Sequence, residues 1–162
     1  MSTYRHIVGN EDPVTVNQLP ADRALVETLQ KSDDPQSQRH CLMLVVDVAR
    51  LFPVAVLDQV MPIFQFVGKT ALQRDDKNTF YSIERTIRTL VPALVMHATD
   101  VDAKISDLLD VFVAAAVHVP AHRRMVLFGV LHNTLATSYA PALVERLVKY
   151  SAEVRMNLIH DG

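Results

Sequence analysis

An apolar helical pattern that ends in a proline occurs twice in this chain, and this repetition limits the folds available to it. The first copy contains Leu44, Val48, Leu51, Phe52 and Pro53, and the second, thirty-nine residues later, contains Ile83, Ile87, Leu90, Val91 and Pro92. Cys41 and Phe80 extend the match backward. A period of this length, carried by helices, is typical of HEAT-type solenoids, in which each helix pair packs against the next. We therefore expect function to lie in surfaces and partners, not in a catalytic pocket.

The composition is typical of a helical domain of this kind. Of the 162 residues, 49% are apolar and 21% are charged, and the formal net charge is −2, which argues against disorder and against a polycationic nucleic-acid binder. The single cysteine, Cys41, lies in the apolar run CLMLVV and is predicted to be a buried, reduced thiol. No apolar run approaches the roughly 18 residues that a membrane span needs. We therefore expect neither an obvious secretion signal nor membrane embedding.

Apolar periodicity divides the chain into two parts. Residues 1–34 are predicted to be a weakly structured N-terminal segment with one short helix, which begins at Pro20 and ends near Gln30. Residues 35–157 are predicted to form a HEAT-like helical repeat domain. The polar run from Lys31 to Gln38 is the clearest linker between helices.

Six stronger helices are predicted in the second part. They cover about residues 38–52, 54–72 with a kink near 58–62 caused by Pro62, and 79–91, followed by a helix with the stripe Ile105, Leu108, Leu109, Phe112, one that opens at Pro120, and one capped by Thr137 or Ser138. Gly68 is predicted to permit the close approach of a neighbouring helix. No strand competes convincingly. The predicted fold is all-α, with antiparallel helix pairs stacked as a short HEAT-like α-solenoid.

A longer stretch, from about Asp47 to Ala136, resembles a known family. The residues that carry the resemblance are Val60, Pro62 to Phe64, Phe66, Gly68, Asp75, Asp76, Phe80, Ile83, Thr86, Ile87, Pro92, Ala93, Leu94 and the HVPAHRR step from His118 to Arg124. In these strings the chain resembles the large HEAT-repeat scaffold proteins of the small-subunit processome, which are associated with the U-three small nucleolar RNA. The strings are specific to that family, but none is a chemical signature.

The resemblance implies a structural scaffold role in ribosomal RNA transcription and early pre-ribosomal RNA processing, in the nucleolus. It implies other processome proteins as partners, with pre-ribosomal RNA or small nucleolar RNA as further ones. Proteins of that family are many times longer than this chain, so we expect the chain to correspond to a fragment of one. From the fold alone, a generic protein-binding solenoid adaptor is an alternative function.

Residue patterns that support catalysis or metal binding are weak. His118 and His122 have the spacing of a helical metal pair, but Pro120 lies between them and no third ligand is nearby in the sequence. The loop carboxylates Asp75 and Asp76 are expected to cap a helix, as adjacent acidic residues in polar turns usually do. No serine has the context of a nucleophile, and no glycine-rich phosphate loop is present. We therefore predict no enzyme activity, no cofactor or metal site and no small-molecule substrate.

Basic side chains are the candidates for contact with RNA or with a protein partner. They are Lys69, Arg74, Arg85, Arg88, Arg123 and Arg124. A solenoid could align some of them into a ridge that contacts phosphate, which gives direct RNA binding as a third possible function. Acidic neighbours and the absence of interleaved aromatic residues weaken that reading, and a solvated helix face is the alternative. Pairing of Arg123 or Arg124 with carboxylates of an adjacent repeat is equally compatible with the sequence.

Overall fold

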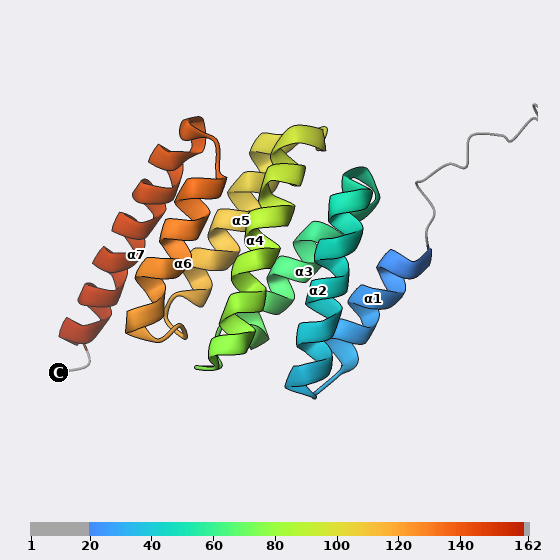
Figure 1. Cartoon of the computed structure of the whole chain (residues 1–162). Helices are drawn as coiled ribbons and strands as arrows, with labels where there is room; N and C mark the ends of the chain where they lie inside the picture. Colours follow the sequence, from blue (N-terminus) through green and yellow to red (C-terminus); the bar gives the residue numbers. More distant parts are fainter. Residues whose placement is uncertain (1–19, 161–162) are drawn as a thin grey trace, which may run out of the picture.

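The computed structural model of the chain describes residues 20–160, whose helices pack in two layers (Figure 1). One layer contains α2 (Pro35–Leu51), α4 (Lys77–His97) and α6 (Ala121–Thr134), side by side. The other contains α1 (Pro20–Lys31), α3 (Val60–Phe66), α5 (Val101–Ala115) and α7 (Ala140–His160). Residues 20–160 contain no strand, so the predicted all-α architecture of stacked helix pairs is confirmed. The weakly structured segment predicted before Pro20 lies outside the described residues.

Two aspartates start the longest helices of the first layer, and they define the repeat better than the proline steps do. Asp34 is the N-cap of α2 and accepts a hydrogen bond from the Ser37 backbone N–H, and Asp76 does the same for Thr79 in α4. The caps are 42 residues apart, not 39. At this spacing several buried positions of the two helices coincide, as in the pairs Cys41 and Ile83, Val45 and Ile87, Ala49 and Val91.

The buried face of α2 differs from the predicted one. Leu44, Leu51 and Phe52 were expected in the core, but they are 50%, 73% and 43% exposed. The core instead takes Leu42, Val46 and Ala49 together with Cys41 and Val45. The reason is that α2 contacts both α1 and α4, so it is turned to bury the sides that meet these two neighbours. Cys41 is buried as predicted, and burial raises the pKa of its thiol.

Within residues 20–160, prolines begin helices more often than they end them. Pro35 occupies the first turn of α2, so the predicted linker of residues 31–38 is reduced to residues 32–34. Pro53 opens a 3-10 helix, η2 (Pro53–Gln59), and α3 begins after it with Pro62 in its first turn, which confirms the expected break. Pro92, in contrast, lies inside α4, which continues to His97. Ala93 and Leu94 beyond it are buried, and their packing offsets the lost hydrogen bond.

Aromatic and aliphatic side chains from both layers share one core. The rings of Phe64 in α3 and Phe112 in α5 meet edge to face, with centroids 5.4 Å apart. The predicted stripe on α5 is confirmed, because its members are at most 1% exposed: Ile105, Leu108, Leu109 and Phe112. Helix α7 follows the 3-10 helix η4 (Thr137–Tyr139) and packs on α5.

Candidate partner-binding surface

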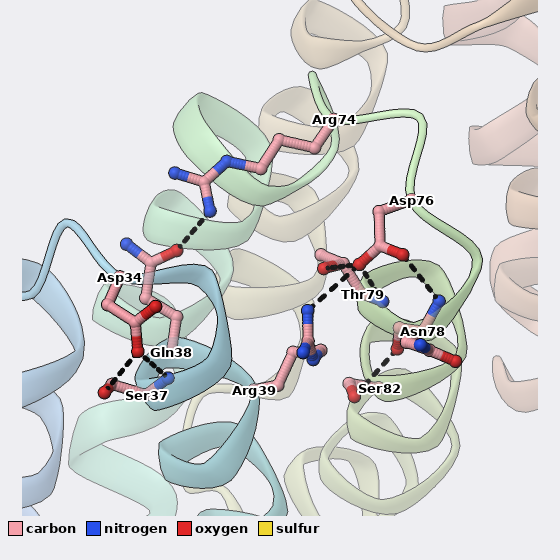
Figure 2. Close-up of polar contacts among 9 residues, drawn as sticks. All are labelled: Asp34, Ser37, Gln38, Arg39, Arg74, Asp76, Asn78, Thr79 and Ser82. Atoms are coloured by element: carbon pink, nitrogen blue, oxygen red, sulfur yellow. Dashed lines mark hydrogen bonds and ion pairs between the residues drawn. The ribbon is translucent and has the colours of Figure 1, made fainter.

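The acidic turn before α4, Asp75–Asp76, is the polar centre of the layer formed by α2, α4 and α6. The Asp76 carboxylate accepts hydrogen bonds from the backbone N–H groups of Asn78 (3.2 Å) and Thr79 (2.9 Å), and from the Thr79 hydroxyl (2.5 Å) (Figure 2). The first N–H groups of a helix have no partner inside it, so this carboxylate satisfies them. The hydrogen bond from the Thr79 side chain is the main cause of the lowered pKa of Asp76. The prediction of helix capping is confirmed for this residue.

The same turn is joined to α2 by two polar bridges, drawn in Figure 2. Nη1 of Arg39 lies 3.1 Å from Oδ2 of Asp76. Beside this pair, Arg74 donates a hydrogen bond to the side-chain oxygen of Gln38 (2.9 Å). Gln38 is itself buried, and its amide donates to the carbonyl of Ser32 (2.5 Å). Arg74, one of the basic residues predicted to contact a partner, therefore binds within the protein.

On its other side the turn is joined to α6. Nε of Arg123 lies 2.5 Å from Oδ1 of Asp75, and Nε2 of His122 lies 3.4 Å from the same oxygen. The Arg123 guanidinium also lies over the ring of Phe80 in α4, 5.0 Å from its centroid, and its side chain is only 17% exposed. The hydrogen bond from Arg123 is the main cause of the lowered pKa of Asp75. The acidic turn therefore binds side chains from both neighbouring helices of its layer, as the pairing alternative for Arg123 anticipated.

The other predicted basic residues occupy separate places. Nε of Arg124 donates to the carbonyl of Val119 (2.8 Å), and Arg88 forms an ion pair with Glu84 (2.8 Å) on the exposed side of α4. Arg85 and Lys69 have no hydrogen-bond or ion-pair partner among residues 20–160. The structure thus brings two of the six predicted residues, Arg74 and Arg123, to the acidic turn. The other four are spread over three elements: Arg85 and Arg88 lie on α4, Arg124 lies on α6, and Lys69 lies in the π-helix η3 (Val67–Ala71) that follows α3. Contact of these residues with a partner stays a prediction.

Large apolar side chains are exposed on all three helices of this layer. Leu44 in α2 is 50% exposed, Tyr81 in α4 is 59% exposed and Met125 in α6 is 85% exposed. We call these three residues, one from each helix of the layer, the apolar row. The apolar pattern of α2 predicted Leu44 in the core, and no pattern singled out Tyr81 or Met125. A usable signal was present, because Tyr81 and Met125 are large apolar residues that lie off the buried stripes of their helices.

Two further properties of the described part concern membranes and metal ions. No helix of residues 20–160 is long and apolar enough to cross a membrane. His118 and His122 lie on either side of the start of α6, and no three His, Cys, Asp or Glu side chains within the same residues are placed to hold a metal ion.

No family model matches the chain. Comparison with individual proteins does show its family. It is 37% identical over 170 residues to U3 small nucleolar RNA-associated protein 10 of Mycosarcoma maydis, an alignment that covers 94% of the chain and 8% of that protein. The proteins of the same name in Schizosaccharomyces pombe and Aspergillus niger are each 39% identical, over 70% of the chain and 7% and 6% of their own lengths. The chain is thus homologous to one short segment of these proteins and belongs to the family of U3 small nucleolar RNA-associated protein 10.

Proposed function

We propose that the chain is a structural scaffold segment of the nucleolar small-subunit processome, in support of ribosomal RNA transcription and early pre-ribosomal RNA processing. The observation that carries this proposal is the match to U3 small nucleolar RNA-associated protein 10 over 94% of the chain. The name of these relatives states an association with the U3 small nucleolar RNA. Other processome proteins are the partners that this role requires, with pre-ribosomal RNA or the U3 RNA reached directly or through them.

The geometry supports binding to protein. Ion pairs of Asp75 and Asp76 join the three helices of one layer, whose outward side chains together form one helical surface. The apolar row lies on these helices, and exposed apolar groups on a rigid helical surface are typical of protein interfaces. A repeat array uses such extended surfaces in place of a pocket.

Direct RNA binding receives less support. Four of the six candidate basic residues already bind groups of the protein itself: Arg74, Arg88, Arg123 and Arg124. Because a cation that is paired within the protein releases few counterions on meeting a phosphate, these side chains add little to RNA affinity. Lys69 and Arg85 remain, and two separated cations do not make a phosphate-binding ridge.

Co-purification from fungal cells tests the proposal. The chain, with an epitope tag, is expressed and immunoprecipitated, and U3 RNA is quantified by reverse transcription while processome proteins are identified by mass spectrometry. We expect enrichment of both, and we expect the proteins to remain after treatment with ribonuclease. Absence of U3 RNA and of processome proteins from the precipitate would refute the proposal and favour a generic adaptor.

The apolar row can be tested in the same assay. The double substitution Tyr81→Glu and Met125→Glu should reduce co-purification at least fivefold, because it places charges on the proposed interface. Val54→Glu is the matched control, since Val54 is a similarly exposed apolar residue (52%) in η2, outside the layer. Equal losses in both variants would mean that the row has no special role. A salt-dependent mobility shift of RNA by the purified chain, abolished by Lys69→Glu with Arg85→Glu, would support the RNA-binding alternative.

A further inference from the structure

A cleft lies in the second layer, where the π-helix η3 meets the C-terminal half of α5. In η3 the backbone N–H of Leu72 bonds to the carbonyl of Val67 (3.0 Å), five residues back, and such wide turns occur frequently at functional sites. Gly68 faces α5 so closely that a Cβ there would lie 3.0 Å from Cγ1 of Val111, which confirms the predicted close approach. Beside this contact the surface opens into a cleft of about 320 Å³.

The rim of the cleft is polar and carries no acidic group. Lys69, Gln65, Gln73 and His118 line it, and all four side chains are exposed. Within residues 20–160 none of these four side chains has a hydrogen-bond or ion-pair partner. An ammonium, two amides and an imidazole thus line one hollow with their hydrogen-bonding capacity unused.

The floor of the cleft is apolar and shallow. It consists of Val111, Ala114 and Ala115 of α5, whose small side chains leave the space that the rim encloses. A volume of about 320 Å³ is at the small end of the range known for binding pockets, about 300–1,000 Å³, and suits a few small side chains better than a cofactor.

We propose that this cleft binds an extended peptide of a partner protein in which an acidic residue lies next to a small aliphatic one. The Lys69 ammonium pairs with the carboxylate, and the aliphatic side chain covers the alanine floor. Glutamine amides carry both a donor and an acceptor, so Gln65 and Gln73 can bind the N–H and C=O groups of an extended backbone. The proposal rests on the proposed function as a protein-binding segment, to which it adds a defined site and a class of ligand.

RNA fits the cleft less well. No Phe, Tyr or Trp side chain lines it, so the His118 imidazole is the one ring on which a base could stack, and Lys69 is the one lysine or arginine among the lining residues. The net charge of −2 gives the chain no long-range attraction for a nucleic acid. A peptide with a carboxylate beside an aliphatic group complements the cleft, which presents the Lys69 ammonium beside a small apolar floor.

The test selects ligands from a library of random nonapeptides displayed on phage, with the purified 162-residue chain as bait. Enriched peptides are synthesised with a fluorescein label, and their affinities are measured by fluorescence anisotropy. We expect peptides that contain Asp or Glu adjacent to Ala, Val or Ile. Lys69→Glu should weaken them at least tenfold, and Ala114→Phe should do the same, because the exposed Ala114 can be enlarged into the cleft without disturbing the core.

Lys77→Glu is the matched control, since Lys77 is an exposed lysine at the start of α4, in the other layer. It makes the same change of charge and should alter affinity less than twofold. Circular dichroism and thermal midpoints that match the wild type show that each variant is folded. The Ala114 and Lys69 variants act by different means, so loss of fold in one leaves the other to decide.

Three outcomes would overturn the proposal. The first is that no acidic peptides are enriched, and the second is that the enriched peptides bind wild type and Ala114→Phe with equal affinity. The third is that acidic peptides do not bind the chain, whereas fluorescein-labelled oligouridine binds it and loses affinity in Lys69→Glu. These results are distinguishable from failure of the proposed function. If the tagged chain still co-purifies with U3 RNA while no peptide is enriched, only the cleft proposal fails.

Discussion

Removal of the Asp76 carboxylate should destabilise the protein by about 2–3 kcal/mol, even though the group lies at the surface. Loss of a helix N-cap costs about 1 kcal/mol. The hydroxyl of Thr79, which is 4% exposed, would lose its acceptor, at a further cost of about 1 kcal/mol. The ion pair with Arg39 adds less than about 1 kcal/mol, because the Asp76 side chain is 40% exposed and water screens the pair.

Two further substitutions separate these contributions. Asp76→Asn keeps an oxygen for the backbone and hydroxyl of Thr79 but removes the charge that Arg39 meets, so it should cost less than about 1 kcal/mol. Asp34→Ala removes the equivalent cap of α2, where no interhelical ion pair is present within the described residues, and it should have a smaller effect than Asp76→Ala. Urea unfolding followed by circular dichroism measures all three. Equal midpoints for Asp76→Ala and Asp76→Asn would refute the assignment of capping as the main term.

Titration of the Asp76 carboxylate should make the stability of the protein depend on pH. The pKa of Asp76 is lower in the folded protein than its ordinary value, so its stabilisation is fully present above the unfolded pKa of about 3.9 and is lost as pH falls through the lower folded pKa. The stability difference between wild type and Asp76→Asn should therefore be constant from about pH 7 to 5 and should narrow below about pH 4. A difference that persists unchanged at pH 2 would mean that the charge of Asp76 is not its source.

Other perturbations test the packing and the ends of the fold. Leu109→Ala should lower the free energy of unfolding by roughly 2–4 kcal/mol, because Leu109 is fully buried. Arg85→Ala should change it by no more than about 0.5 kcal/mol. Equal urea midpoints for the two variants would contradict the assignment of Leu109 to the buried face of α5 and of Arg85 to the outer face of α4. Gly129→Ala should stabilise by about 0.5–1 kcal/mol, since a methyl group there meets nothing within 4 Å and favours helix, and a lowered thermal midpoint would contradict this. Val144 and Val148, 54% and 61% exposed on α7, should cause self-association at high concentration, and the double substitution to Glu should abolish it in sedimentation experiments.

The register of the repeat shows where local pattern misleads. Pro53 and Pro92 look equivalent in the sequence, yet one opens a 3-10 helix and the other lies inside α4. A proline restricts its own dihedral angles and those of the residue before it, but whether a helix continues past it depends on what the next turn buries. The caps Asp34 and Asp76 are better markers, because capping is decided by residues within three positions of each other.

The candidate surface could be predicted only in part. The ion pair of Glu84 with Arg88 can be predicted from the sequence, since both residues lie on one helix four positions apart. The pairing of Arg123 with Asp75 joins residues 48 positions apart, and the sequence left it open as one of several possibilities. The cleft beside Lys69 combines residues of α3, η3 and α5 with residues that follow η3 and α5. Of all these, only Gly68 gave a local sign that another helix comes close.

The sequence by itself determined that the chain is helical, where most α-helices lie, the cap at Asp76 and the family, because these depend on periodicity and on short strings of neighbouring residues. The predicted cap of the last helix was wrong, because Thr137 and Ser138 lie in the 3-10 helix η4 and α7 begins at Ala140. Only the tertiary structure decided which side of each helix is buried. Helix α2 carries apolar residues around most of its circumference, so its pattern allows several buried faces, and contact with both α1 and α4 selects Leu42 and Val46 over Leu44 and Leu51. The apolar row, the contacts of the acidic turn and the cleft likewise depend on which helices pack side by side, since a surface exists only once the neighbours of each helix are in place.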